Sequence, residues 1–376
     1  MIAFIKMQKQ NLECGKMDLL ELVIAGKELD SSELVKLYDY DLFTLGSAAN
    51  SIREKKYQKK VFFNMNRHIN PTNICADVCK FCAFSASRKN PNPYEMTIEE
   101  IVSQVLNSYN RGAKEVHIVS AHSPNYPYEW YINCFKEVKK AAPKIHLKAM
   151  TAAEVYYLSK KFDKHHIKVL EDMINAGVDS MPGGGAEIFN EEIRKIICRD
   201  KVSSKNWLEI HKDWHKMGKM SNATMLFGHI ESREHRIEHM LLLKKAQTDS
   251  QIVESKNGGF NAFIPLLFQR DNNFLKINSL TSGQEILKTI AISRIILRNF
   301  PHIKAYWATL GMNLALVAQE FGADDMDGTI ENESIQSAGG SKSKNGASKE
   351  NLIAYIKDAG FRPIERDSLY NELVEY

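Results

Sequence analysis

Short apolar runs alternate with amphipathic segments from residue 61 to residue 327, and this alternation restricts the possible folds more than any other feature of the chain. Eight runs have the composition of buried strands: residues 61–66, 115–120, 145–150, 178–182, 223–227, 262–268, 304–307 and 323–327. Apolar residues at helical spacing occur between them, over residues 98–111, 130–140, 169–176, 191–198, 204–217, 233–248, 283–299 and 314–320. Strands that alternate with helices pair in parallel, and eight such units close a (βα)8 barrel of the TIM type. The sequence therefore predicts an α/β barrel.

The predicted barrel spans residues 61–335, and further segments flank it on both sides. Helical spacing over residues 19–25, 30–38 and 43–56 predicts an N-terminal helical extension within residues 1–60. Residues 339–348 are rich in Gly and Ser and predict a flexible surface loop. A helix over residues 349–359 and a final tail then complete a C-terminal cap, which we place at residues 336–376.

Composition excludes several other classes of protein. The chain has 376 residues, 44% of them hydrophobic, and its 50 basic and 46 acidic side chains leave a net charge of +4. These values argue against a disordered chain and against the clustered basic surface of a nucleic-acid-binding protein. The first apolar run covers only residues 1–5, and no stretch approaches the ~18 apolar residues of a membrane span. We therefore expect a cytoplasmic protein without a membrane span.

Three of the six cysteines are concentrated in one segment, where Cys75, Cys79 and Cys82 have the spacing C-x3-C-x2-C. Thiols in a reducing cytosol do not usually form disulfides, so metal binding is the first explanation. Three thiolates in one loop can bind three corners of an iron–sulfur cubane and leave the fourth iron open to a small molecule. The loop follows the first predicted strand, and barrel active sites lie at that end of the strands. The segment therefore predicts a [4Fe-4S] cluster in the active site.

The cysteines allow two other interpretations. A zinc site needs a fourth ligand, and His68, the nearest candidate, precedes the loop. Cys134 and Cys198 lie in predicted helices, where a cysteine usually behaves as a small buried hydrophobic residue. The third possibility is that the clustered cysteines are unrelated buried residues. The spacing favours the cluster over both alternatives.

This cysteine motif on a βα barrel resembles the radical S-adenosylmethionine (SAM) superfamily. The resemblance implies that the open iron binds the amino and carboxylate groups of SAM. It also implies that the reduced cluster cleaves SAM to a 5′-deoxyadenosyl radical, with an electron supplied by a donor such as flavodoxin or ferredoxin. The expected cofactors are therefore the [4Fe-4S] cluster and SAM, with SAM consumed as a cosubstrate.

A closer resemblance extends from about residue 19 to residue 376 and is carried by seven motifs. They are His68-Ile69-Asn70-Pro71-Thr72-Asn73, Phe81-Cys82-Ala83-Phe84-Ser85, Pro182-Gly183-Gly184-Gly185-Ala186-Glu187-Ile188-Phe189, Ser221-Asn222-Ala223-Thr224-Met225, Gly228-His229-Ile230-Glu231, Phe263-Ile264-Pro265-Leu266 and Gly322-Ala323-Asp324-Asp325-Met326-Asp327-Gly328-Thr329. Together they resemble the aminodeoxyfutalosine synthases of the futalosine route to menaquinone, whose relatives are the dehypoxanthine futalosine cyclases and the deazaflavin-cofactor (FO) synthases. The forms Asn-Pro-Thr-Asn and Cys-Ala-Phe-Ser favour the synthases.

The resemblance implies an addition reaction. The adenosyl radical adds to the enol-ether double bond of 3-[(1-carboxyvinyl)oxy]benzoate, the aryl group migrates and a carboxylate is lost. The products are 6-amino-6-deoxyfutalosine, methionine and CO2 or bicarbonate. One alternative is the cyclase reaction, in which the radical abstracts hydrogen from a nucleoside. A second alternative, of another class, is a non-catalytic iron–sulfur protein with a closed cluster.

Residues at the ends of the middle strands are the candidates for binding SAM. Gly183 and Gly184 permit close approach of the backbone to a ligand, although a tight turn also explains them. Glu187 is a candidate partner for a ribose diol, with a solvated carboxylate as the alternative. Asn222 and Thr224 alternate along one strand and so share a face, which we expect to point into the barrel. Ser120, followed by Ala121, stands where relatives have a Gly-Gly pair.

The candidates for acting on the substrate are less sharply defined by the sequence. A dicarboxylate substrate favours bidentate arginine, and we select Arg270 first and Arg88 second. His229 continues the face of the fifth strand, but it can instead pair with Glu231. His68 is a candidate proton donor or carboxylate partner, with packing below the cluster as the alternative. Three acids at the eighth strand can bind Mg²⁺, although capping and hydrogen bonding are the preferred explanation: Asp324, Asp325 and Asp327.

Overall fold

A computed structural model describes residues 17–251, 258–332, 334–341 and 346–376 of the protein. The apolar run at residues 1–5, Cys14 and residues 342–345 of the predicted flexible loop lie outside the described residues. Among the residues described, no helix is both long enough and apolar enough to cross a bilayer.

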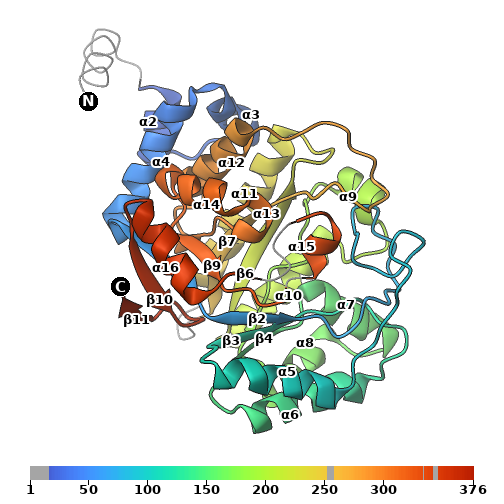
Figure 1. Cartoon of the computed structure of the whole chain (residues 1–376). Helices are drawn as coiled ribbons and strands as arrows, with labels where there is room; N and C mark the ends of the chain where they lie inside the picture. Colours follow the sequence, from blue (N-terminus) through green and yellow to red (C-terminus); the bar gives the residue numbers. More distant parts are fainter. Residues whose placement is uncertain (1–16, 252–257, 333, 342–345) are drawn as a thin grey trace.

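The main sheet contains seven parallel strands in the order of the chain (Figure 1). They are β2 (Asn66–Ile69), β3 (Glu115–Ile118), β4 (His146–Ala149), β5 (Ser180–Met181), β6 (Met220–Phe227), β7 (Gly259–Leu267) and β8 (His302–Ile303). β9 (Asp325–Gly328) and the residues that follow it join both edges through single bridges: Asp325 pairs with Lys304 on one side, and Glu331 pairs with Arg67 on the other. The predicted α/β barrel class is therefore confirmed, with a regular ladder of seven strands and a bridged eighth.

A second sheet with the order β11-β10-β1-β9 lies beside the barrel and corrects the first predicted strand. Residues 61–66 do not form one strand, because β1 (Lys60–Asn64) belongs to this second sheet and β2 begins at Asn66. β10 (Arg362–Arg366) pairs in parallel with β1, and β11 (Glu372–Glu375) pairs antiparallel with β10. The sequence did not predict these last two strands, because their many charged residues lack the apolar pattern of a buried strand.

Most of the helices that connect the strands cover the outside of the sheet (Figure 1). They are α5 (Ile98–Asn110), α6 (Tyr128–Ala141), α7 (Ala152–Lys161), α8 (His166–Asn175), α9 (Glu191–Cys198), α10 (Ser204–Lys216), α11 (Arg233–Gln251), α12 (Gly283–Ile296), α13 (Trp307–Leu310), α14 (Met312–Val317), η2 (Ala318–Phe321), α15 (Ile335–Ala338) and α16 (Lys349–Asp358). The expected capping box of α5 is present, since Thr97 Oγ1 accepts from the Glu100 amide at 3.3 Å while Glu100 accepts from the Thr97 amide at 2.8 Å. α7 was missed, and the strand predicted at residues 304–307 lies two residues earlier.

The N-terminal segment folds as α2 (Leu19–Ile24), α3 (Ser31–Leu34), η1 (Val35–Asp39) and α4 (Leu42–Tyr57). It is attached to α12 of the barrel by two hydrogen bonds. The Tyr38 hydroxyl lies 3.2 Å from Thr289 Oγ1, and Lys288 Nζ donates to the Tyr38 carbonyl at 2.6 Å. The predicted helical character of this segment is confirmed.

Buried histidines between β6, α10 and α11 make the stability of the fold dependent on pH. Burial lowers the pKa values of His215 and His239 from 6.5 to about 3. Between pH 6.5 and pH 3 the unfolded chain therefore binds protons at these positions that the folded chain excludes. The free energy of unfolding should fall by up to about 1.4 kcal/mol per histidine for each pH unit in this range. Urea unfolding at pH 7 and pH 5 measures this slope, which should become shallower in His239→Gln; an unchanged slope would contradict the assignment.

Candidate active site

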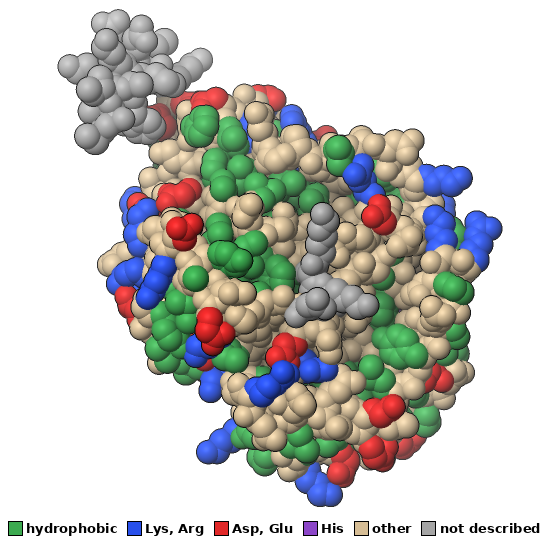
Figure 2. Space-filling model, viewed as in Figure 1, with side chains coloured by type: hydrophobic (Ala, Val, Ile, Leu, Met, Phe, Trp, Pro, Cys, Tyr) green, Lys and Arg blue, Asp and Glu red, His purple; other side chains and the backbone are tan. Residues whose placement is uncertain are grey.

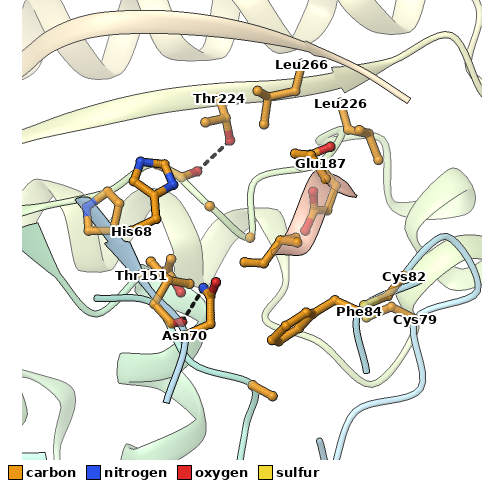
Figure 3. Close-up of a pocket in the computed structure, with 18 of the residues that line it drawn as sticks. His68, Asn70, Cys79, Cys82, Phe84, Thr151, Glu187, Thr224, Leu226 and Leu266 are labelled. Carbon is orange, nitrogen blue, oxygen red and sulfur yellow. Dashed lines mark hydrogen bonds between the residues drawn. The ribbon is translucent and has the colours of Figure 1, made fainter. Parts of the chain in front are cut away.

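One cavity of about 280 Å³ lies at the C-terminal ends of the barrel strands and extends down into the barrel. Its lining includes Cys75, Cys79 and Cys82, together with residues from strands β2, β3, β4, β6, β7 and β9. Figure 3 shows Cys79 and Cys82 on one side of this pocket and His68 on the opposite side. Charged side chains of both signs occur around the face shown in Figure 2.

Side chains of the segment before the cysteines hold the cysteine loop in place. Asn70 Nδ2 donates to the Val119 carbonyl at 2.9 Å, which ties the end of β2 to the end of β3. Thr72 Oγ1 donates to the Tyr94 carbonyl at 2.6 Å, and Asn73 accepts from the Tyr94 amide at 3.0 Å. The polar residues of the Asn-Pro-Thr-Asn motif therefore form hydrogen bonds that position the loop.

The loop is also attached from its other side. Asp77 lies 2.9 Å from His122 Nδ1, and the Ala76 amide donates to the His122 carbonyl at 2.8 Å. The His122 ring stacks on Tyr157, with 4.8 Å between the ring centroids. A loop attached at several points holds its thiols in place before any ligand arrives, which lowers the cost of ordering on binding.

The donor set fits an iron–sulfur cubane better than a single metal ion. Across the described part of the chain, no three His, Cys, Asp or Glu side chains converge on one point where an ion could bind. A cubane is held at separate corners, so its ligands need not converge. Burial raises the pKa of Cys79, which the nearby Lys201 ammonium opposes. Cys134 and Cys198 are buried and do not line the cavity, as expected for packing residues.

The glycine run after β5 combines a tight turn with a cavity wall. Gly183, Gly184 and Gly185 all line the cavity, and Gly185 has a φ of 90°. The Gly183 carbonyl accepts from Thr224 Oγ1 at 2.6 Å, a bond drawn in Figure 3. The Gly184 carbonyl accepts from Trp207 Nε1 at 3.0 Å. The tight turn is therefore confirmed, while close approach of a ligand to these glycines stays a prediction.

We expect Gly183→Ala to destabilise the protein by about 1–3 kcal/mol, because a β-carbon there has no space. It would lie 2.7 Å from the Asn222 carbonyl oxygen and within 2.9 Å of the Ala223 backbone, neither of which can rotate away. Gly283→Ala is the matched control, since a β-carbon at that helical position meets nothing within 4 Å. Urea unfolding of both variants checks the prediction, and equal stabilities would contradict it.

Glu187 is not a solvated carboxylate, so the alternative explanation offered for it by the sequence is wrong. It is buried, lines the cavity and lies 2.7 Å from Lys201 Nζ. Burial favours the neutral acid, but Lys201 together with Arg194 and His229 lowers the pKa of Glu187 below its usual value, so the carboxylate is ionised. Its φ of 47° lies in the left-handed region, which is uncommon for residues other than glycine and often marks a functional site. Its position remains compatible with binding a ribose diol.

Among the described polar side chains of the cavity wall, those of Asn222 and Ser120 have an oxygen atom without a partner. Asn222 Oδ1 and Ser120 Oγ are buried and form no hydrogen bond with the described residues. Both residues line the cavity. Buried polar atoms normally have a partner, so a ligand is the natural candidate for both. Thr224 differs from them, because its hydroxyl already donates to Gly183.

The structure does not bring His229, Arg270 or Arg88 together with the cavity residues. His229 lies 3.2 Å from Glu231 and 3.1 Å from the Leu226 carbonyl, which is the self-satisfied pair considered above. Arg270 is exposed, and Arg88 is exposed and lies over the Phe274 ring. None of the three lines the cavity. Their roles stay predictions without geometric support.

The acids of the eighth strand do not form a magnesium site. Asp324 pairs with Arg294, Asp325 with Arg366, and Asp327 with Lys304. Each carboxylate is thus neutralised by a cationic side chain from another part of the chain. The expected hydrogen-bonding role is therefore confirmed, whereas the expected helix capping is not observed. Sequence analysis missed the partners of these acids, because residues distant in sequence supply them.

His68 lines the cavity as predicted, and the structure adds neighbours that sequence analysis missed. His68 Nε2 lies 3.3 Å from Nδ1 of His117, and Glu115, Lys148 and Lys304 line the same part of the cavity. The signal for these residues was weak, because each is a single polar residue at an inward position of a short strand.

Comparison with known proteins agrees with this geometry. Residues 69–243 match the family described as the radical SAM superfamily, and residues 257–375 match the CofH/MqnC C-terminal region. An aminodeoxyfutalosine synthase of Thermus thermophilus is 40% identical over 94% of this chain and 95% of its own length.

Two further relatives carry different names. A cyclic dehypoxanthine futalosine synthase of Streptomyces coelicolor is 32% identical over 95% of this chain and 88% of its own length. A 5-amino-6-(D-ribitylamino)uracil–L-tyrosine 4-hydroxyphenyl transferase of Methanopyrus kandleri is 33% identical over 96% of this chain and 97% of its own length.

Solved structures share the fold at low sequence identity. The FeFe-hydrogenase maturase HydG from Carboxydothermus hydrogenoformans superposes with a TM-score of 0.71 at 16% identity, covering 93% of this chain and 79% of that chain. Methylornithine synthase (PylB) gives a TM-score of 0.66 at 18% identity, covering 92% of this chain and 97% of that chain. With the cysteine loop at the mouth of the barrel and these matches over nearly its whole length, the chain belongs to the radical SAM superfamily, whose members use a [4Fe-4S] cluster and SAM, and within it to the group that contains the aminodeoxyfutalosine synthases and the cyclic dehypoxanthine futalosine synthases.

Proposed function

We propose that this protein is an aminodeoxyfutalosine synthase, which joins the adenosyl group of SAM to 3-[(1-carboxyvinyl)oxy]benzoate. The products are 6-amino-6-deoxyfutalosine, methionine and CO2 or bicarbonate. The observation that carries the proposal is the identity of 40% to a relative of that name over 94% of the chain. The cavity, with three thiols at its mouth and both apolar and cationic walls, supports it.

The proposal assigns the binding of the cluster to Cys75, Cys79 and Cys82. The cluster, when bound and reduced, supplies the electron that cleaves SAM. Asn222 Oδ1, Ser120 Oγ and the ionised Glu187 are then the groups of this chain that hold polar parts of SAM, with Gly183 and Gly184 allowing close approach. A flavodoxin or ferredoxin is the proposed electron donor.

Apolar side chains on the cavity wall exclude water from the path between SAM and the substrate. Phe84, Leu226, Ile264, Leu266 and Phe268 line this wall. A radical that adds to a double bond must be kept from other hydrogen donors, and a dry, closely packed wall serves that purpose.

The deciding experiment is anaerobic reconstitution of the protein followed by mass spectrometry of the products formed from SAM and the enol-ether benzoate. The proposal expects the adenosyl carbon skeleton within the product. Release of free 5′-deoxyadenosine with a nucleoside substrate would instead identify a cyclase. Parallel incubations with dehypoxanthine futalosine, and with tyrosine and 5-amino-6-(D-ribitylamino)uracil, test the activities named in the other two relatives.

A cluster that forms but does not respond to SAM would overturn the proposal in favour of a non-catalytic iron–sulfur protein. The electronic spectrum of the reconstituted cluster, recorded with and without SAM, provides this check independently of the substrate.

A further inference from the structure

The deep end of the cavity carries a group of charged and titratable side chains that the proposed reaction has not yet used. We call this group the polar floor; it consists of His68, Glu115, His117, Lys148, Lys304 and Asp327, all of which line the cavity. Glu115 is the first residue of β3, whereas the cysteine loop follows the last residue of β2. Glu115 therefore lies deeper in the barrel than the thiols, and Figure 3 shows His68 on the side of the pocket opposite Cys79 and Cys82.

The two lysines of the polar floor retain hydrogen-bond donors. Lys148 Nζ lies 2.7 Å from Glu115, and Lys304 Nζ lies 3.1 Å from Asp327. The lysine side chains are each only 4% exposed. An ammonium group has three donors, so each lysine has donors beyond the one that faces its carboxylate. Buried donors without acceptors are costly, so a ligand oxygen between the lysines would be stabilised.

The charges around the polar floor are balanced before a ligand enters. Lys148, Lys304 and the buried Arg366 provide positive charge, while Glu115, Asp327 and Asp325 provide negative charge. Burial, followed by the neighbouring His68, lowers the pKa of His117, so its ring is neutral. The neutral His117 ring adds no charge to this balance.

The shape of the proposed substrate determines which of its carboxylates reaches this end. The vinyl carbon of the enol ether must face the thiols, where SAM binds. The carboxylate on the ring is the one farthest from that carbon, and it is retained in the product. The ring between them meets the apolar wall formed by Leu226, Ile264 and Leu266.

We propose that Lys148 and Lys304 bind the ring carboxylate of an aryl carboxylic acid on the polar floor, beside the His68–His117 pair. This inference rests on the proposed function, because it takes its ligand from that reaction. It assigns Lys148 and Lys304 as positioning residues that fix the aromatic ring and so place the enol ether towards SAM.

Calorimetry on the anaerobically reconstituted full-length protein tests the proposal. The probes are 3-[(1-carboxyvinyl)oxy]benzoate and its methyl ester at the ring carboxylate. The variants Lys304→Met/Asp327→Asn and Lys148→Met/Glu115→Gln remove one ion pair each, so neither leaves a buried charge unpaired. We expect each to weaken binding of the diacid by ~10- to 100-fold while the ester binds almost as before, since charged hydrogen bonds have this strength.

Lys139→Met/Asp179→Asn is the matched control, because this pair lies 2.9 Å apart outside the cavity. It should bind the diacid as the wild type does, and SAM affinity should be unchanged in all three variants. If a floor variant fails to fold, the wild-type protein alone decides, because it must prefer the diacid to the ester by at least tenfold. Equal binding of diacid and ester, or diacid affinity that survives both floor substitutions, overturns the proposal.

The same data separate this inference from the proposed function. If the diacid binds in a lysine-dependent way but no nucleoside product forms, the polar floor is supported as an aryl carboxylate site. The same result contradicts the proposed reaction. If the floor variants form product and bind the diacid with unchanged affinity, the carboxylate site on the polar floor is contradicted. The proposed reaction is then still supported.

Discussion

Cys79→Ala is expected to abolish both the absorbance of the reconstituted cluster and turnover. Cys79 is one of three thiols in the loop that lines the cavity mouth, and a cubane held by two thiolates is not retained. The described residues offer no converging His, Cys, Asp or Glu group that would substitute for the lost ligand. Iron and sulfide analysis, visible absorbance and product formation measure the effect together.

Cys134→Ala is the control for this prediction. Cys134 is fully buried on α6 and does not line the cavity. Its removal should cost about 1 kcal/mol of stability through lost packing and leave cluster content and turnover unchanged. Normal turnover in Cys79→Ala would refute the assignment of the cluster.

Arg366→Met is expected to have the largest effect on stability, a loss of about 3–5 kcal/mol. Arg366 on β10 donates to Asp325 on β9 at 2.6 Å, and their side chains are 1% and 0% exposed. The guanidinium also lies 4.1 Å from the centroid of the Tyr370 ring. Its removal leaves the Asp325 carboxylate buried without its cation, between the barrel and the C-terminal strands.

Arg362→Met on the same strand is the matched control. Arg362 lies 2.8 Å from Glu375, but both side chains are more than 40% exposed, so the variant should change the free energy of unfolding by only about 0.5 kcal/mol. Neutralising the orphaned acid in Arg366→Met/Asp325→Asn should recover part of the loss. Urea unfolding of the four proteins measures these differences; equal losses in Arg366→Met and Arg362→Met would show that the ion pair does not stabilise the fold.

The elements that the sequence predicted best are those whose signal is local. The capping box at Thr97 and Glu100, the helices over residues 43–56 and 98–111, and the spacing of the three cysteines all involve residues within a few positions of each other. The prediction from the sequence was wrong where one apolar run is divided between two sheets. Residues 61–66 look like one strand, but the chain changes sheets between Asn64 and Asn66.

The candidate site divides in the same way. The cysteine loop and the glycine turn were predicted because each lies in one short motif, whereas the partners of the polar groups were not. Glu187 and its partner Lys201 are 14 residues apart in the sequence, and His68 and its partner His117 are 49 residues apart. Arg270 was selected because a dicarboxylate needs a cation, yet the cations that line the cavity are lysines on other elements.

The sequence by itself determined the class of fold, the cysteine loop and the superfamily, because periodicity and motif spacing are properties of neighbouring residues. Only the tertiary structure decided which charges neutralise one another and which polar atoms stay unpaired. The energy of a buried charge depends on what the fold places within a few ångströms of it, and that distance is unrelated to separation along the chain.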